Sequence, residues 1–299
     1  MPRQESFLMT ATTAPGGTAK LAGREVARIG YGVMQLGRPG TDRADQVKLL
    51  REAANAGVNH LDTAQFYSDG RCNDLIREAF APYPDDLVVV TKVGAEESAQ
   101  RLRLAQQPEQ LRAQVEANLA ALGVEQLDVV NLRRADAGPG LIAEGDQLVD
   151  IDDQLAELIS LRDAGKIGSL GLSNVSADQL RHALGAEIVC VQNSYNVLYR
   201  ATEPALELCR DHEIAWVPYF PLGSAFELGQ DVRGNPVVTG IAAELGCTPA
   251  QVALAWLLQR YAGTLLIAGT ASSAHLAENL AAGQVQLPAE AVAALDRLG

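Results

Sequence analysis

The sequence is poor in cysteine and in aromatic residues. It has four cysteines among 299 residues, Cys72, Cys190, Cys209 and Cys247, and aromatic side chains make up 5% of the chain. Four cysteines are few for a disulfide scaffold of this length, and their spacing matches no zinc or redox motif. We therefore expect reduced thiols, which are typical of a cytoplasmic protein.

Long apolar runs and an excess of positive charge are also absent. No apolar run reaches the ~18 residues that a membrane span needs. Lys and Arg total 24 against 37 Asp and Glu, which gives a formal net charge of −13. A chain of this sign lacks the basic patch that attracts nucleic acid or an anionic membrane, so we expect neither as a partner.

The first 17 residues differ from the rest of the chain. They lack the basic start and the apolar core of a signal peptide, and we expect residues 1–17 to be a flexible lead-in. No linker-like change of composition interrupts residues 18–299, which predicts a single domain. The stretches TAKLAG and REVARIG surround Ala22–Gly23 and predict a short hairpin at the start of that domain.

Eight apolar runs of strand length recur along the domain. They are continuous rather than alternating, as in strands that are buried on both faces. Helical patterns separate them, and the clearest is an apolar stripe between Pro108 and Gly123. Capping-box patterns at Ser176 and Thr248 predict the starts of two further helices. The eight runs are 28–34, 58–64, 87–93, 127–132, 167–173, 187–193, 214–220 and 264–270.

Strands that alternate with helices predict a parallel sheet, and eight such strands close a (β/α)8 TIM barrel. The alternative is an open doubly wound sheet, which carries a glycine-rich dinucleotide turn after its first strand. The nearest candidate, GYGVMQ from Gly30, lacks the third glycine. Polar residues also cluster where the runs end, and barrel enzymes build their sites there. We therefore predict an α/β fold, a (β/α)8 TIM barrel with a short N-terminal β-hairpin.

Three of these polar residues suit the reduction of a carbonyl group. VNHLDTAQFY places Asp62 at the end of the second run and Tyr67 on the following loop, and VVVTK ends the third run at Lys92. A tyrosine beside a cation is a better proton donor at neutral pH, because the cation stabilises its phenolate. Singly, each residue is more often structural. Together, at adjacent strand ends, they predict a general-acid site.

These motifs resemble those of the aldo-keto reductases, (β/α)8 enzymes that use a nicotinamide cofactor without a Rossmann fold. The resemblance runs from about residue 24 to residue 298 and includes GVNHLDTAQFY, VVVTKVG, GLSN, VQNSYN, PYFPLG and GTASSAHLAEN. It implies a small carbonyl substrate, and it makes Asp62, Tyr67 and Lys92 three of the family's four catalytic residues. DVVNLR, GYGVMQL and ALAWLLQR are similar to the bacterial branch that reduces pyridoxal to pyridoxine with NADPH.

The fourth catalytic residue of the family is usually a histidine after strand four, and this sequence has Arg133 there. None of the four histidines can replace it by position. Arginine is always charged and offers several donors, so it suits a carbonyl oxygen, an acidic phenol or a developing alkoxide. Pyridoxal carries a phenolic oxygen beside its aldehyde. The alternative is a structural salt bridge from Arg133 to a loop carboxylate such as Asp136.

The resemblance also implies where the cofactor binds. Tyr219 matches the aromatic residue that stacks on the nicotinamide ring. Ser173, Asn174 and Gln192 match the residues that hold the carboxamide. Leu222, Gly223 and Ser224 begin the loop that passes the pyrophosphate, and Thr270, Ser272, His275, Glu278 and Asn279 match the adenosine end.

The adenosine end departs from many NADPH-dependent members of the family. Residues 264–283 contain no Lys or Arg to face the 2′-phosphate, which leaves His275, hydroxyl groups and a helix N-terminus. We still expect NADPH, with NADH as the alternative, because the similar branch uses NADPH. No metal site is predicted, since His and carboxylate ligands do not recur at the strand ends.

Three other functions stay open at this point. A cofactor-binding sensor or regulatory barrel with little turnover fits the missing histidine, although the intact catalytic trio argues against it. A general aldehyde reductase with a different substrate fits equally well, because substrate loops are the variable part of a barrel. These loops are residues 94–106, 134–150 and 223–236, and the first two are too irregular to assign structure. An unrelated barrel enzyme is the third, and the sequence does not indicate an oligomeric state.

Overall fold

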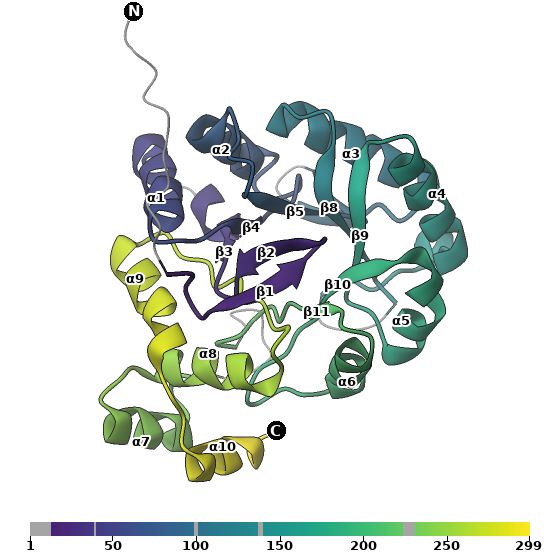
Figure 1. Cartoon of the computed structure of the whole chain (residues 1–299). Helices are drawn as coiled ribbons and strands as arrows, with labels where there is room; N and C mark the ends of the chain where they lie inside the picture. Colours follow the sequence, from purple (N-terminus) through teal and green to yellow (C-terminus); the bar gives the residue numbers. More distant parts are fainter. Residues whose placement is uncertain (1–12, 39, 99–100, 137–139, 224–230) are drawn as a thin grey trace, which may run out of the picture.

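The computed structural model describes residues 13–38, 40–98, 101–136, 140–223 and 231–299. Most of the predicted lead-in therefore lies outside the described residues. Seven parallel strands form one curled sheet in the order β11-β10-β9-β8-β5-β4-β3, and helices surround it (Figure 1). The strands are β3 (Tyr31–Gly32), β4 (His60–Asp62), β5 (Val88–Val93), β8 (Leu127–Arg133), β9 (Ile167–Ser173), β10 (Ile188–Gln192) and β11 (Ala215–Trp216).

The eighth predicted strand closes the barrel through isolated bridges. Thr264 bridges to Trp216 of β11, and Leu266 bridges to Ile29, both in parallel. Beyond these bridges the backbones of the first and eighth strands still approach each other closely, next to Gly32. A Cβ added to Gly32 would lie 2.5 Å from the carbonyl oxygen of Ile267. The predicted (β/α)8 barrel is confirmed, with terminal strands that are shorter than the apolar runs.

The predicted N-terminal hairpin is also confirmed, and it covers one end of the barrel (Figure 1). Its strands are β1 (Thr18–Leu21) and β2 (Arg24–Ala27), and the turn residues Ala22 and Gly23 have φ of 51° and 77°. Leu21 and Val26 are fully buried in a cluster with Val88 of the barrel interior. The hairpin thus supplies apolar side chains that fill the barrel opposite the predicted site.

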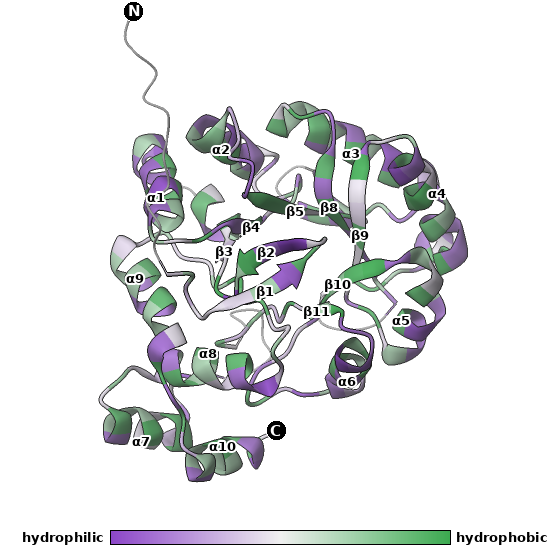
Figure 2. Ribbon diagram, in the orientation of Figure 1, coloured by the Kyte–Doolittle hydropathy of each residue, from purple (hydrophilic) through white to green (hydrophobic). Residues whose placement is uncertain are grey.

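Ten α-helices lie among the described residues, mostly around the outside of the sheet. Gly123 ends one of them with a φ of 69°, and Ser176 and Thr248 form the predicted capping boxes. Figure 2 shows green, apolar residues on the strands and most of the purple, hydrophilic residues on the outer helices. The helices are α1 (Arg43–Asn55), α2 (Arg71–Phe80), α3 (Pro108–Leu122), α4 (Ile151–Asp163), α5 (Ala177–Ala183), α6 (Glu203–Asp211), α7 (Pro236–Leu245), α8 (Pro249–Arg260), α9 (Ser273–Ala281) and α10 (Ala289–Asp296).

One predicted substrate loop contains a hairpin that the sequence did not assign. Strands β6 (Ala95–Ser98) and β7 (Arg101–Leu104) pair in antiparallel fashion within residues 94–106. The alternating letters RLRL were the available signal for β7.

No single helix in the described ranges is long and apolar enough to cross a membrane; α7 and α8 pass that test only as a pair, bent by 94°.

Candidate active site

The predicted trio converges where β4 and β5 end. Lys92 Nζ donates to Asp62 Oδ1 at 2.7 Å and to the carbonyl oxygen of Thr63 at 2.8 Å. The same Nζ lies 4.9 Å from the centre of the Tyr67 ring. Asp62 and Lys92 are only 3% and 5% exposed, so each charge needs the other to remain buried. The structure thus brings together all three residues of the predicted general-acid site.

A strained turn holds Tyr67 beside this pair. The three residues that follow it, Ser68, Asp69 and Gly70, all have positive φ, between 52° and 81°. Ser68 Oγ donates to the carbonyl oxygen of Gly37 at 2.9 Å, and Asp69 N donates to Glu97 Oε2 at 3.0 Å. These bonds stabilise left-handed backbone at two residues that carry a Cβ, which is otherwise unfavourable. The tyrosine is therefore presented by a fixed loop.

The electrostatics of the trio favour a neutral acid beside a permanent cation. Burial raises the pKa of Tyr67, and the charges of Lys92 and Arg133 oppose that rise. Burial acts against the charge on Lys92, but Asp62 and Tyr67 outweigh it and raise the Lys92 pKa above its ordinary value. At neutral pH Tyr67 therefore keeps its proton and Lys92 keeps its charge, which is the state that a general acid requires.

Arg133 lies at the end of β8, the strand next to β5. Its Nη1 atom is buried and has no hydrogen-bond partner among the residues that the structure describes. Its positive charge opposes the rise that burial causes in the pKa of both Tyr67 and Tyr219. The alternative of a salt bridge to Asp136 is wrong, because that carboxylate binds the neighbouring Arg134 instead. A buried guanidinium nitrogen without a partner suits an oxygen atom of a bound ligand.

The residues assigned to the carboxamide lie at the ends of β9 and β10. Asn174 has a φ of 62°, and its Nδ2 donates to the carbonyl oxygen of Arg134 at 3.0 Å. Tyr219 Oη donates to Asn174 Oδ1 at 3.1 Å. Gln192 Nε2 donates to Asp62 Oδ2 at 2.8 Å. Ser173 is buried at the end of β9, the strand next to the one that ends at Gln192. Gln192 therefore connects the residues predicted to bind the cofactor directly to Asp62 of the trio.

The loop predicted to pass the pyrophosphate is described only in part. Leu222 and Gly223 are half-buried just after Tyr219, and Gly223 has a φ of 87°. Ser224 lies outside the described residues.

The residues assigned to the adenosine end gather at the start of α9. Ser272 is the N-cap residue of this helix, and its backbone N–H donates to Thr270 Oγ1 at 3.1 Å. His275 is exposed in the first turn of the helix, and Asn279 is buried in it. The Glu278 carboxylate accepts a hydrogen bond of 2.6 Å from Thr248 Oγ1, so it joins α9 to α8.

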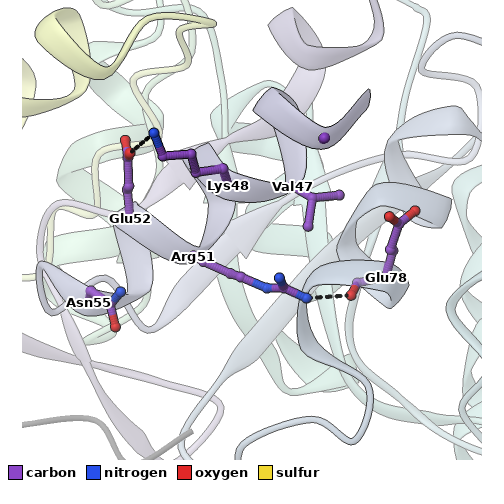
Figure 3. A pocket seen from close by; sticks show the side chains of 7 residues that line it. Val47, Lys48, Arg51, Glu52, Asn55 and Glu78 are labelled. Carbon is purple, nitrogen blue, oxygen red and sulfur yellow. Dashed lines mark hydrogen bonds and ion pairs between the residues drawn. The ribbon is translucent and has the colours of Figure 1, made fainter. Parts of the chain in front are cut away.

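A lysine from another part of the chain lies near this end. Ser273 Oγ donates to Glu52 Oε2 at 2.6 Å, and Glu52 forms an ion pair of 3.7 Å with Lys48 on α1. Lys48 and Glu52 line a pocket of about 400 Å³. Figure 3 shows both side chains on α1, with Arg51 reaching from the same helix toward Glu78. Sequence reasoning missed this cation because it considered only the residues of segment 264–283.

The combination of these groups defines the class of protein. A parallel barrel with a buried Asp–Lys pair beside a protonated tyrosine has the general acid of a carbonyl oxidoreductase. Over the described ranges, no group of three or more His, Cys, Asp or Glu residues is placed to hold a metal ion. Residues 28–299 match the model of the Aldo/keto reductase family, and the chain belongs to this family.

Relatives of known name support the same assignment. The chain is 44% identical over 286 residues to pyridoxine 4-dehydrogenase of Escherichia coli K12, covering 93% of this chain and 97% of that protein. It is 31% identical to an uncharacterised oxidoreductase of Schizosaccharomyces pombe, covering 95% and 90% of the two chains. The predicted family and enzyme class are therefore confirmed.

Solved structures show the same fold. A thermostable aldo-keto reductase in complex with epalrestat superimposes with a TM-score of 0.79 at 26% identity, covering 94% of this chain and 99% of that one. An aldo/keto reductase of Klebsiella pneumoniae in complex with NADP and acetate gives a TM-score of 0.77 at 26% identity, with 94% of each chain covered.

Proposed function

We propose that this enzyme reduces the aldehyde of pyridoxal to the alcohol pyridoxine with NADPH, and that Tyr67 is the general acid. The 44% identity to a pyridoxine 4-dehydrogenase over nearly the whole chain supports the substrate. The K. pneumoniae relative that holds NADP supports the cofactor. The observation that carries the proposal is the buried Nη1 of Arg133, which has no partner among the described residues and whose charge acts on Tyr67, since pyridoxal offers an acidic phenol oxygen beside its aldehyde.

The residues that are present fit a nicotinamide cofactor. When bound, the cofactor supplies the hydride. Asn174 and Gln192 would hold its carboxamide, and the half-buried ring of Tyr219 offers a flat face for the nicotinamide. The N-terminus of α9 supplies positive potential that suits an adenosine 2′-phosphate. Glu52 bonds Ser273 at this end, and its ion-pair partner Lys48 offsets the charge of that carboxylate.

The reaction uses the trio in a defined order. As hydride reaches the carbonyl carbon, the carbonyl oxygen becomes an alkoxide and takes the proton of Tyr67 Oη. Lys92 stabilises the phenolate that remains, and Asp62 holds Lys92 in place through the 2.7 Å contact. Tyr67 then regains a proton from solvent. A positioned general acid of this kind contributes roughly 10²–10⁴ in rate.

Arg133 tests the substrate part of this proposal. We expect Arg133→Ala to raise the KM for pyridoxal and for 2-hydroxybenzaldehyde, and to leave the KM for benzaldehyde nearly unchanged, because only the first two carry the phenol oxygen. A lost charge-assisted hydrogen bond of about 1.5–3 kcal/mol corresponds to a KM that is roughly tenfold to a hundredfold higher. Initial rates of NADPH oxidation at varied aldehyde concentration give the three KM values.

Arg297→Ala is the matched control, because Arg297 is an exposed arginine at the end of α10 and lies outside the predicted substrate loops. It should leave all three KM values unchanged. If Arg133→Ala affects the three aldehydes equally, the arginine does not recognise the phenol, and a general aldehyde reductase becomes the better description.

We also propose a cytoplasmic location. All four cysteines are free thiols in the structure, and three of them are buried. Free thiols persist in the reducing cytosol rather than in oxidising compartments. Fractionation of cells that express the chain at its native level tests this, and enrichment in an exported fraction would contradict it.

A further inference from the structure

A continuous series of buried amide side chains lies behind the ends of β5 and β8. Its members are Gln106, Gln114 and Gln154, which are 1%, 8% and 0% exposed. Each forms hydrogen bonds to backbone or side-chain groups of neighbouring elements. A buried amide is stabilising only when its oxygen and its NH2 group both have hydrogen-bond partners. A series of such amides therefore indicates that they hold the neighbouring backbone segments in one arrangement.

Gln106 has an unusual pair of acceptors. Its Nε2 donates to the carbonyl oxygen of Gly94 at 2.6 Å and to that of Arg133 at 2.9 Å. Gly94 follows Lys92 by two residues, and Arg133 is the last residue of β8. One side chain therefore joins the two strand ends that carry the catalytic lysine and the arginine.

Gln106 bonds both strand ends because the pairing of β5 with β8 stops just before them. The regular pairing of β5 with β8 stops at Val93 and Leu132. Gly94 then turns away with a φ of 108°, and a Cβ on it would lie 2.4 Å from the carbonyl oxygen of Arg133. Past this point the Arg133 carbonyl lacks a ladder partner on the β5 side. The two N–H groups of a single amide bond both carbonyls; that of Arg133 gains a donor it lacks on this side, and that of Gly94 accepts from Gln106 in addition to the N–H of Ala105 at 3.2 Å.

The orientation of the Gln106 amide is itself fixed from behind. Gln154 Nε2 donates to Gln106 Oε1 at 3.0 Å and to its carbonyl oxygen at 2.7 Å. Arg134 Nη1 in turn donates to Gln154 Oε1 at 2.5 Å. A cation thus determines the direction of the whole series, which leaves Gln106 Nε2 facing the two strand ends.

We infer that Gln106 is a positioning residue that fixes Arg133 relative to Lys92 and Tyr67. The substrate consequence rests on the proposed role of Arg133, whereas the geometric consequence does not. Charged and titratable groups that face Tyr67 come from β4, β5, β8 and the segment after β11: Asp62, Lys92, Arg133 and Tyr219. Of these, Gln106 contacts Arg133 directly, at its carbonyl oxygen, and reaches the strand of Lys92 only at Gly94, two residues further on.

The test compares Gln106→Leu, Arg133→Ala and the double variant. Arg133 lowers the Tyr67 pKa, so its displacement moves the alkaline limb of kcat/KM for benzaldehyde to higher pH. We expect the two single variants to move this limb in the same direction, and the double variant to move it no further than Arg133→Ala. We also expect a pyridoxal KM that is about tenfold higher in Gln106→Leu, since small misplacements of a binding group have effects of this order or larger.

Asn59→Ala is the matched control, because Asn59 is also an amide that bonds two backbone groups, those of Ala27 and Glu25, at the opposite end of the barrel. It should lower the melting temperature without moving the pH limb. If Gln106→Leu does not fold, Gln154→Met removes the support of Gln106 and should move the limb in the same direction by less.

The outcomes separate the two proposals. An unchanged limb in a folded Gln106→Leu enzyme, or shifts that add in the double variant, would overturn the positioning role. An unchanged limb in Arg133→Ala would overturn it as well. A shared shift of the limb, combined with an unchanged pyridoxal KM in Arg133→Ala, would support the positioning role and reject the substrate assignment.

Discussion

At the scale of single residues, the site depends on charges that are each held by a named partner. Lys92 has Asp62 and the Thr63 carbonyl, and Asp62 has Gln192 on its second oxygen. Arg133 is the exception, since its buried Nη1 has no partner in the described part of the chain. A ligand oxygen would complete that set, and this is why Arg133 rather than the trio distinguishes one carbonyl substrate from another.

Lys48 gives a prediction for the choice of cofactor. We expect Lys48→Ala to weaken NADPH binding by about two- to fivefold, the size of an exposed ion pair, and to leave NADH binding unchanged. The reason is that Lys48 is linked to the start of α9 through Glu52 and Ser273. Fluorescence titration with both cofactors measures this. Lys20→Ala removes an exposed lysine on β1 of the N-terminal hairpin and should change neither. Equal losses for NADPH and NADH in Lys48→Ala would reject the role of Lys48.

At the scale of elements, the N-terminal hairpin should act as a structural part of the barrel. We expect Leu21→Ala to lower the free energy of unfolding by about 2–5 kcal/mol, because Leu21 is 1% exposed and packs against the barrel strands. Urea denaturation of both proteins gives the difference. Leu102→Ala on β7 removes a leucine that is 39% exposed and should cost less than about 1 kcal/mol. Similar losses in the two variants would show that the hairpin does not fill the barrel.

Much of this arrangement was predictable from sequence because strand ends of a parallel barrel meet at one edge. Asp62, Tyr67, Lys92 and Arg133 were found in that way. The β6–β7 hairpin, Gln106 and Lys48 were not. The β6–β7 hairpin has too few β-branched residues to stand out. Its cross-strand pair of two apolar residues, Ala95 and Leu104, lies at one end of the ladder.

The other misses arise from contacts that sequence order does not contain. Gln106 is bonded to Gly94 and Arg133, which are 12 and 27 positions away, and an isolated glutamine on a predicted loop gives no signal. Lys48 and Ser273 lie on helices that are adjacent only because the barrel closes. Such long-range hydrogen bonds become visible only in the folded structure.

At the scale of the whole molecule, His60 should weaken the barrel in mild acid. Burial lowers its pKa to about 4 from an ordinary 6.5, although the carbonyl groups of Ala27 and Leu266 lie nearby. The unfolded chain therefore takes up a proton first, and this contribution to stability is present above pH 6.5 and lost as the pH falls toward 4. The loss reaches about 2 kcal/mol at pH 5 and about 3 kcal/mol in full.

Urea denaturation at pH 7.5 and pH 5 measures that loss. His60→Leu should show a smaller difference between the two pH values than the wild-type protein, and His212→Ala, an exposed histidine, should show the wild-type difference. We expect a single cooperative transition in each case, as for one domain over residues 18–299. An equal pH difference in His60→Leu would show that another group causes the acid sensitivity.

The most direct test of the central claim is the turnover of pyridoxal with NADPH by the wild-type enzyme and by Tyr67→Phe. This substitution removes one hydroxyl group and leaves the ring beside Lys92 in place. We predict that kcat falls by roughly 10²–10⁴ while the dissociation constant for NADPH, measured by fluorescence, stays the same. Undiminished turnover in Tyr67→Phe, or a wild-type protein that binds NADPH without reducing any aldehyde, would contradict the account.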